Sequence, residues 1–389
     1  MKIHPLFEKR RIFAPGPTPV PEEILSELGR SPLHHRTKAF ITILERVKKN
    51  LQFLFQTKQP AYLFAASGTG AMEATVVNLF SPGDEVLVID GGKFGERWVS
   101  IGQAFGLKVQ SLKVEWGKAV EPSAVLKALQ ANRAFRGVLF QASETSTAVV
   151  HPTREIADIV RKNHDALVVV DAITALGVED LPMDAWGLDA VISGSQKALM
   201  LPPGLAFLAL SERAQKKRSQ SGIPAFYYDL KHEDEAAHDG ETAWTPAVGL
   251  IQALDLVLQR FVTTGLAPVF QHHARLAEGT RRGIRAMGLE LAAQGAYSNA
   301  VTAVKVPSSI PEGSKVVSYL RDRFAITVAG GQDSWKGKVF RLAHLGYFDE
   351  IDMLSLLSAV ELTLKKLGAP IELGRGVGAA TQYFAENEF

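Results

Sequence analysis

Short apolar runs alternate with longer amphipathic segments between residues 61 and 210. The runs are dense in Val, Leu, Ile and Ala with little polar alternation, which is typical of strands buried on both faces of a sheet. The predicted strands are Val86–Asp90, Leu107–Lys113, Gly137–Gln141, Ala166–Asp171, Ala190–Ser193 and Leu205–Leu210. The helical patterns between them are Gly70–Phe80, Arg97–Phe105, Pro122–Ala131 and Arg154–Asn163. This repetition predicts an α/β fold with a mostly parallel, doubly wound sheet.

The pattern changes after Pro246. Two long helical patterns lead into a smaller unit of strands and helices, and its last helix is expected to close the chain. These segments are Val248–Phe261, Leu266–Met287, Asn299–Val306, Gly313–Phe324, Val339–Leu342 and Glu350–Leu367. We therefore expect an N-terminal arm (1–25), a large domain (26–265) and a smaller C-terminal α+β domain (266–389). The polar stretches Gln215–Gly222 and Asp229–Glu241 are predicted to be solvated loops.

Composition narrows the class of protein. The 389 residues carry 43 Lys and Arg against 41 Asp and Glu, so the formal charge of +2 recruits neither nucleic acid nor an anionic membrane. No apolar run approaches the ~20 residues needed to span a bilayer. The basic N-terminus also lacks the apolar region of a secretory signal. We therefore expect a cytoplasmic protein without membrane or nucleic-acid partners.

Cysteine is absent from the chain. Its absence excludes disulfides, thiolate metal sites and a cysteine nucleophile. The pair His272-His273 lies in a polar helical pattern, has no carboxylate cluster nearby and is expected to be solvated. No metal site is predicted.

Lys197 is the first candidate for chemistry. It follows the apolar pattern Ala190–Ile192, and the rigid run Pro202-Pro203-Gly204 comes before the next strand. A lysine held in a turn at the mouth of a sheet is suited to lose its proton and attack a carbonyl. A free lysine has a pKa near 10.4, and a desolvated pocket lowers that pKa enough to give a usable base.

The turn Ser67-Gly68-Thr69-Gly70 opens a helical pattern and is a candidate phosphate site. Glycines and small hydroxyls at a helix N-terminus leave backbone N–H groups free to bind phosphate, and the helix dipole adds attraction. The glycine spacing matches neither the dinucleotide fingerprint nor a P-loop. An ordinary capped turn is the alternative interpretation.

Three further candidates stand at strand ends. Asp171 closes its strand, so its carboxylate is expected at the carboxyl edge of the sheet. There it could hold a heteroaromatic nitrogen in the protonated form, although a helix cap is the alternative. Thr145 in Glu144-Thr145-Ser146-Thr147 brings a hydroxyl to the same edge, and Phe94 in a glycine-rich loop could stack on a planar ligand or serve packing alone. Together with Lys197, these groups predict one site for a flat, phosphorylated ligand.

The order and type of these residues resemble the class V aminotransferases, pyridoxal-phosphate enzymes of fold type I. The resemblance is greatest to the serine/alanine–glyoxylate (serine–pyruvate) aminotransferase branch and covers nearly the whole chain. It rests on Pro15-Gly16-Pro17-Thr18, His35-Arg36, Ser67-Gly68-Thr69-Gly70-Ala71-Met72-Glu73-Ala74, Ser193-Gly194-Ser195-Gln196-Lys197-Ala198 and Phe340-Arg341-Leu342-Ala343-His344-Leu345-Gly346.

The resemblance implies pyridoxal 5′-phosphate (PLP) as the cofactor. Lys197 would form the internal aldimine and move a proton between the substrate Cα and the cofactor C4′. Asp171 would bind the pyridine nitrogen, and Thr145 the ring hydroxyl. Phe94 would stack on the ring, where many relatives have tryptophan. The phosphate side would be held by Ser67, Gly68, Thr69 and Gln196.

On the substrate side, the resemblance implies that Arg341 grips the α-carboxylate, for which a two-pronged guanidinium is suited. Gly16 and His35 would line the substrate pocket. In the family, the stretch matching residues 242–246 reaches into the partner subunit's site. Thr242 and Thr245 are therefore expected to touch the cofactor phosphate across a homodimer interface, although this segment diverges from several relatives.

The implied reaction is transamination between a small amino acid, such as serine or alanine, and a 2-oxo acid, such as glyoxylate or pyruvate. Aspartate and 2-aminoethylphosphonate stay open as donors, although Arg341 favours an α-carboxylate over a phosphonate. Among lyases and hydrolases of the same fold, the absence of cysteine opposes a desulfurase, and a kynureninase-type hydrolase fits the terminal motifs less well. A cofactor-binding regulator would need a longer DNA-binding arm than residues 1–25, and a bare nucleotide-binding domain would need a fingerprint that the chain lacks.

Overall fold

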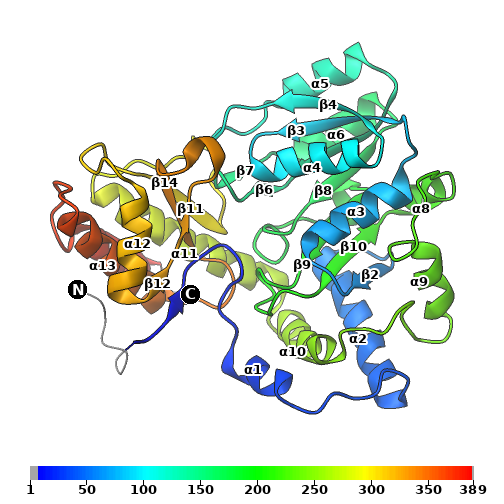
Figure 1. The fold of residues 1–389 in the computed structure, drawn as a ribbon, viewed down its shortest axis with the longest axis horizontal. Coiled ribbons are helices and arrows are strands. Elements are labelled where there is room, and N and C mark those ends of the chain that lie inside the picture. The colour runs from blue at the N-terminus through cyan, green and yellow to red at the C-terminus, as the bar shows by residue number, and fades with distance from the viewer. Residues whose placement is uncertain (1–7, 388–389) are drawn as a thin grey trace.

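The structure, a computed structural model, describes residues 8–387 and has two parts (Figure 1). The larger part is built on a seven-stranded sheet and the smaller part on a three-stranded sheet. We call them the large and the small domain and propose the boundary at Gly265, where α10 (Val248–Thr264) and α11 (Leu266–Ala286) meet at 95°. No single helix in the described range is long and apolar enough to cross a membrane, and only the bent α10–α11 pair passes such a test jointly. Residues 1–7 of the expected N-terminal arm lie outside the described residues.

The sheet of the large domain has the strand order β2-β10-β9-β8-β5-β3-β4. Pairing is parallel from β9 to β4, whereas β10 is antiparallel to both of its neighbours. The predicted α/β class with a mostly parallel sheet is therefore confirmed. The strands are β2 (Ala61–Phe64), β3 (Glu85–Asp90), β4 (Lys108–Lys113), β5 (Phe135–Gln141), β8 (Leu167–Asp171), β9 (Ala190–Gly194) and β10 (Ala206–Leu210).

Helices cover both faces of this sheet because side chains along each strand alternate between two hydrophobic cores. Val86 and Val88 pack on the side of α3 and α4, whereas Leu87 and Ile89 pack with α2 and α10 on the other side. The helices of the large domain besides α10 are α1 (Glu22–Leu28), α2 (Lys38–Phe55), α3 (Gly68–Leu79), α4 (Lys93–Ala104), α5 (Pro122–Ala131), α6 (Thr153–Asn163), α7 (Met183–Trp186), α8 (Glu212–Arg218) and α9 (Leu230–Ala237).

The small domain is an antiparallel sheet of order β11-β14-β13; α11 and α12 contact this sheet, and α13 and α14 pack on those helices. Its hydrophobic core includes Phe340 and Leu342 from the middle strand β14. A short hairpin of the large domain, β6 and β7, lies on the side that faces β14 (Figure 1). These elements are β6 (Ser143–Glu144), β7 (Val149–Val150), β11 (Val301–Lys305), α12 (Ser314–Phe324), β13 (Ala329–Gly330), β14 (Val339–Ala343), α13 (Glu350–Lys366) and α14 (Arg375–Glu386).

The N-terminal segment connects the two domains. Its strand β1 (Arg11–Ile12) pairs in parallel with β12 (Ile326–Thr327) of the small domain. Phe13 then enters the small-domain core and stacks on Phe348 with ring centroids 5.0 Å apart. From there the segment runs to α1 beside the large domain, as the blue ribbon in Figure 1 shows.

Three expectations from the sequence are wrong. The stretches 215–222 and 229–241 are not only loops, because α8 ends at Arg218 and α9 occupies Leu230–Ala237. Helix α13 does not close the chain, since α14 follows it. His273 is buried rather than solvated, and its ring bonds Val269 O (2.9 Å) and Gly346 N (3.1 Å).

Candidate active site

The candidate residues of the large domain meet at the carboxyl edge of its sheet. Asp171 is the last residue of β8 and lies in register with Gln141 of β5 and Ile192 of β9. Glu144 follows β5 by three residues, and Lys197 follows β9 by three. Because neighbouring parallel strands end on the same side, the fold brings these side chains to one place.

Lys197 is buried at this edge and enclosed by the N-terminal segment. Its Nζ donates to Pro15 O, and its own carbonyl accepts from Thr18 Oγ1 at 2.9 Å. Gly16 has φ of 131°, and a Cβ there would stand 2.6 Å from Lys197 Nζ, so both the backbone conformation and the lysine require glycine. The structure therefore brings Gly16 together with Lys197.

Burial lowers the pKa of Lys197 to about 8, and Arg341 and Arg97 add to the lowering while Asp171 opposes it. At that pKa about one molecule in ten carries the neutral amine at pH 7. An exposed lysine with a pKa near 10.4 carries fewer than about one in a thousand. Lys197 is thus available as a nucleophile and a base at neutral pH.

Asp171 is a buried carboxylate without a counterion in the part of the chain that the structure describes. Its side chain accepts one hydrogen bond there, from Ile173 N at 2.8 Å. Burial raises the pKa of Asp171 to about 7, and Glu144 raises it further, while the bond from Ile173 and the charges of Lys197 and Arg97 lower it. A cationic partner at this carboxylate would offset the cost of its burial.

The turn predicted to bind phosphate lies beside the end of β9, the strand that precedes Lys197. Helix α3 begins at Gly68, and its N-cap residue Ser67 makes no side-chain capping bond. Gly70 N donates to Ser67 O at 2.8 Å, whereas the N–H groups of Gly68 and Thr69 bond no acceptor among the described residues. A Cβ on Gly194 would stand 3.1 Å from Gln196 Oε1 and 3.6 Å from Gly68 N, which places Gln196 at the turn. Gln196 Oε1 is buried without a hydrogen-bond partner, which marks a place where a further polar group belongs.

Thr145 and Phe94 are linked through Glu144, a residue to which the sequence assigned no role. The backbone N–H groups of Phe94 and Gly95 donate to Glu144 Oε2 at 3.0 and 3.2 Å. The carboxylate thereby caps α4, on whose first turn Phe94 stands. Thr145 Oγ1 lies 2.5 Å from Thr174 Oγ1, so its hydroxyl is held at the same edge. The only signal in the sequence for Glu144 is its place next to Thr145.

Arg341 reaches the site from the small domain. It stands on the middle strand β14, where its Nε donates to Gly330 O at 3.1 Å. Its Nη1 crosses to the large domain and donates to Thr145 O at 3.0 Å. No carboxylate forms an ion pair with it within residues 8–387, and burial lowers its pKa to about 10, so it stays cationic at neutral pH. A buried guanidinium held by carbonyls is ready to bind an incoming carboxylate.

The structure does not bring His35, Thr242 and Thr245 together with these residues in the described chain. His35 lies between α1 and α2 and stacks on His34 with ring centroids 4.5 Å apart. Thr242 Oγ1 donates to Trp244 O at 2.7 Å in a segment beside α9. Their assignment to the site stays a prediction.

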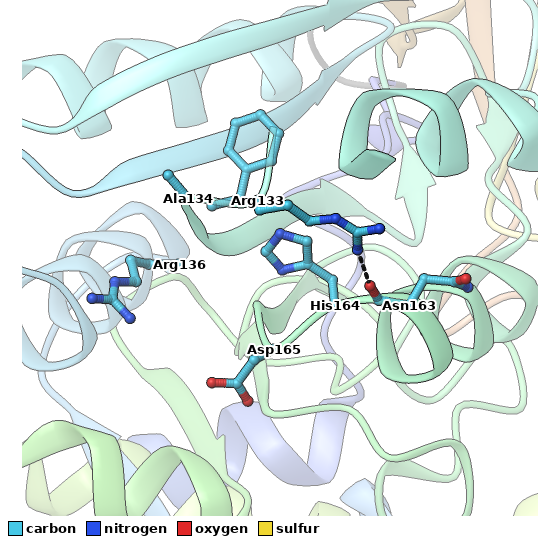
Figure 2. Close-up of a pocket in the computed structure, with 7 residues that line it drawn as sticks. Arg133, Ala134, Arg136, Asn163, His164 and Asp165 are labelled. Carbon is cyan, nitrogen blue, oxygen red and sulfur yellow. Dashed lines mark hydrogen bonds between the residues drawn. The ribbon is translucent and has the colours of Figure 1, made fainter. Parts of the chain in front are cut away.

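An opening lies at the opposite edge of the sheet, where β5 and β8 begin (Figure 2). It has a volume of about 390 Å³ and is lined by Arg133, Ala134, Phe135, Arg136, Asn163, His164 and Asp165. Arg133 Nη1 donates to Asn163 O at 2.6 Å, the bond drawn in Figure 2. None of the candidate residues lines this opening, so it is separate from the candidate active site.

Comparison with known proteins gives consistent matches over nearly the whole chain. The sequence profile of the family described as aminotransferase class-V matches residues 16–344. The soluble hydrogenase 42 kDa subunit of Anabaena cylindrica is 41% identical over 97% of this chain and 99% of its own length. The L-aspartate–glyoxylate aminotransferase of Paracoccus denitrificans is 34% identical over 96% of each chain. The serine–glyoxylate aminotransferase of Hyphomicrobium methylovorum is also 34% identical, over 97% of this chain and 95% of its own.

A solved structure shares the fold as well. The ureidoglycine–glyoxylate aminotransferase of Bacillus subtilis superimposes with a TM-score of 0.92 at 29% sequence identity. The match covers 97% of this chain and 98% of that one, so both domains are included.

Proposed function

Because the chain belongs to the class V aminotransferase family, we propose that it is a PLP-dependent aminotransferase that transfers an amino group from a small amino acid to glyoxylate. Pyruvate is the second acceptor to consider. One observation carries the proposal. A buried amine, a buried carboxylate and a buried guanidinium meet at one site, and neither Asp171 nor Arg341 has an ionic partner bonded to it among the described residues.

The residues fit PLP on several counts. Lys197 offers a partly neutral amine for a covalent link to the cofactor aldehyde. Asp171 lacks the cation that a protonated pyridine nitrogen would supply. The N–H groups at the start of α3 offer donors for the phosphate, and Gln196 would join them with its amide turned so that Nε2 rather than Oε1 faces the turn. Phe94 and Thr145 are proposed to contact the ring and its hydroxyl.

The chain's own groups would divide the work as follows. PLP, when bound, draws electrons away from the substrate Cα. Arg341 binds the α-carboxylate and so orients the bond to be broken. Lys197 Nζ would take the proton from the substrate Cα and deliver it to the cofactor C4′. Asp171 keeps the cofactor nitrogen protonated, and Gly16 leaves room for the amine to move.

Glyoxylate is the proposed acceptor because the Paracoccus, Hyphomicrobium and Bacillus proteins are all named for it. The same names divide the donor between aspartate and serine, and we retain serine or alanine as the first choice and aspartate as the second. The hydrogenase activity for which the Anabaena relative is named is not proposed for this chain. Iron–sulfur clusters are held by cysteine thiolates, and this chain contains no cysteine.

We further propose a cytoplasmic homodimer in which Thr242 and Thr245 approach the partner subunit's cofactor phosphate. Two observations support it. Neither threonine contacts the Lys197 group within the described chain, and Phe226 beside this segment is 71% exposed. Phe226 packs on Trp244 with ring centroids 4.9 Å apart, so an apolar surface adjoins Thr242 and Thr245.

The direct test is spectroscopic. The purified protein should be yellow from a PLP–lysine chromophore, and borohydride should attach the cofactor covalently to Lys197. Adding single amino acids should bleach the band with the true donor, and glyoxylate should restore it. A protein that shows no band and no label at Lys197 would contradict the proposal. Bleaching by aspartate alone would exclude serine and alanine as donors.

A further inference from the structure

Arg97 lies between the phosphate turn and the aromatic ring of the proposed site. It stands one helical turn after Phe94 on α4, so both side chains project from the same face of the helix. Its Nη1 donates to Thr69 Oγ1 at 3.1 Å, and its Cζ lies 4.8 Å from the Phe94 ring centroid. The guanidinium therefore touches two residues that the proposed function assigns to the cofactor.

No carboxylate neutralises Arg97 within residues 8–387. Its hydrogen bond to Thr69 uses one of five N–H donors, and the side chain is half-buried. By comparison, the partly buried Arg213, at the edge of the sheet opposite the site, pairs with Asp189. Arg97 is thus a cation with free donors at the edge of the site.

The charge of Arg97 also acts on the centre of the site. It contributes to lowering the pKa of Lys197 and of Asp171, although burial has the larger influence on both. The contacts with Thr69 Oγ1 and the Phe94 ring place the guanidinium on the side of the site, in agreement with both effects.

The phosphate turn has no other cation of its own. The residues proposed to hold the phosphate in this chain, Ser67, Gly68, Thr69 and Gln196, are all uncharged. A phosphate monoester carries a charge of about −1.5 to −2 at neutral pH. The helix dipole of α3 supplies only about half a positive charge. A guanidinium matches phosphate oxygens with two parallel donors, which makes Arg97 the group that can complete the neutralisation.

We propose that Arg97 is a phosphate-binding residue of this site, reaching the cofactor phosphate from α4 beside Thr69. The inference rests on the proposed function, because it takes the phosphate to be that of PLP. The same contacts allow a different role, in which Arg97 only ties α4 to α3 and keeps Phe94 in place. The two roles differ in whether the phosphate group of the ligand matters.

The test compares two ligands that differ only in that group, PLP and pyridoxal, on the full chain. Dissociation constants of both are measured by absorbance for the wild type, Arg97→Gln and Arg97→Lys. We expect Arg97→Gln to weaken PLP binding by about 10- to 100-fold, as for a lost charge-assisted hydrogen bond, and pyridoxal binding by less than about 3-fold. Arg97→Lys keeps the charge and should fall between the wild type and Arg97→Gln. Arg154→Gln, an exposed arginine at the start of α6, is the matched control and should change neither constant.

A second measurement does not depend on the cofactor ring. Inorganic phosphate should raise the melting temperature of the cofactor-free wild type, and Arg97→Gln should lose that response. Equal weakening of PLP and pyridoxal, or an unchanged phosphate response in Arg97→Gln, would overturn the inference. Failure of the proposed function is distinguishable, since the wild type itself would then bind neither ligand and show no borohydride label at Lys197.

Discussion

The large domain presents its share of the candidate site on short loops at the edge of a parallel sheet, whereas the small domain presents Arg341 from the middle of a strand. Lys197 and Glu144 follow the ends of β9 and β5, and Asp171 closes β8 between those strands, so one sheet sets their spacing. Arg341 is aimed by its own sheet through Gly330 O and by the other domain through Thr145 O. The proposed cofactor subsite thus depends mainly on one domain, and the proposed carboxylate subsite depends on how two domains meet.

This difference between the two subsites predicts which functional properties a substitution should change together. A substitution in the sheet-edge group should alter cofactor binding and chemistry, because these residues would touch the ring. A substitution of Arg341 or of a contact between the domains should alter amino-acid binding with the cofactor still in place. Among residues 8–387, one ion pair joins the start of α4 to the small domain, between Lys93 Nζ and Asp333 Oδ2 at 2.8 Å.

The largest effect is expected from Lys197→Ala. The variant loses both the covalent attachment and the group that moves the proton, so turnover should fall by at least about 10⁴-fold. The fold should persist, because the amine bonds only Pro15 O among the described residues. Steady-state kinetics and circular dichroism check the two statements. Transamination retained by this variant would contradict the role of the large domain's edge in the chemistry.

Asp171→Asn should separate activity from stability. Transamination should fall by roughly 10²- to 10³-fold, because a neutral amide does not hold a pyridine nitrogen protonated. Burial raises the pKa of Asp171 to about 7 from an ordinary value of 3.8. Between those two pH values the folded protein holds a proton that the unfolded chain has lost, so the free energy of unfolding falls as pH rises through this window and then levels off.

Asparagine does not titrate, so cofactor-free Asp171→Asn should melt above the cofactor-free wild type by at least about 2 °C at pH 7.5. The difference in melting temperature between the variant and the wild type should grow as pH rises from 5 to 7. With PLP bound the order should reverse, because the pyridinium pairs with Asp171 only in the wild type. A cofactor-free variant that melts below the wild type at pH 7.5 would show that the carboxylate is not destabilising.

Arg341 tests the other domain's contribution. Arg341→Ala should lower kcat/KM for the amino acid by about 30- to 1,000-fold, because a buried charge partner is worth roughly 2–4 kcal/mol. Arg341→Lys should lose less, since it keeps the charge but not the two-pronged geometry. The absorbance band of bound PLP should stay within a few per cent of the wild type in both. Loss of the band would mean that the two subsites are not separable.

The smallest effect is expected from Asp333→Asn, which removes the Lys93–Asp333 pair between the domains while keeping a residue that tolerates the φ of 42° there. Both side chains are partly exposed, so the pair is worth at most about 1 kcal/mol. We expect KM for the amino acid to rise by less than about 5-fold at low salt and not at all near 1 M salt. Glu96→Gln removes Lys93's other partner, within the large domain, and is the matched control. An equal rise in KM for Glu96→Gln would show that the bridge between the domains has no special part.

Local patterns were enough to predict most of the fold. Six strands and five helices lie within a few residues of their predicted bounds, because buried strands and amphipathic helices leave strong periodic signals. They are β3, β4, β5, β8, β9, β10, α3, α5, α6, α10 and α11. The polar helices α8 and α9 were missed since charge-rich segments carry little apolar periodicity. Their capping residues, Ser211 and Asp229, were the signal that could have revealed them.

The sequence by itself determined that Asp171, Thr145 and Lys197 share one edge, because strand order does not matter when parallel strands all end on the same side. Only the tertiary structure decided that Arg341 meets Thr145, that Gly16 packs against Lys197 Nζ, and that Glu144 and Arg97 join the site. These contacts join residues between 28 and 196 positions apart, and no local periodicity encodes a pairing over such a distance. These contacts form because the small domain, helix α4 and the N-terminal segment all pack against the carboxyl edge of the sheet.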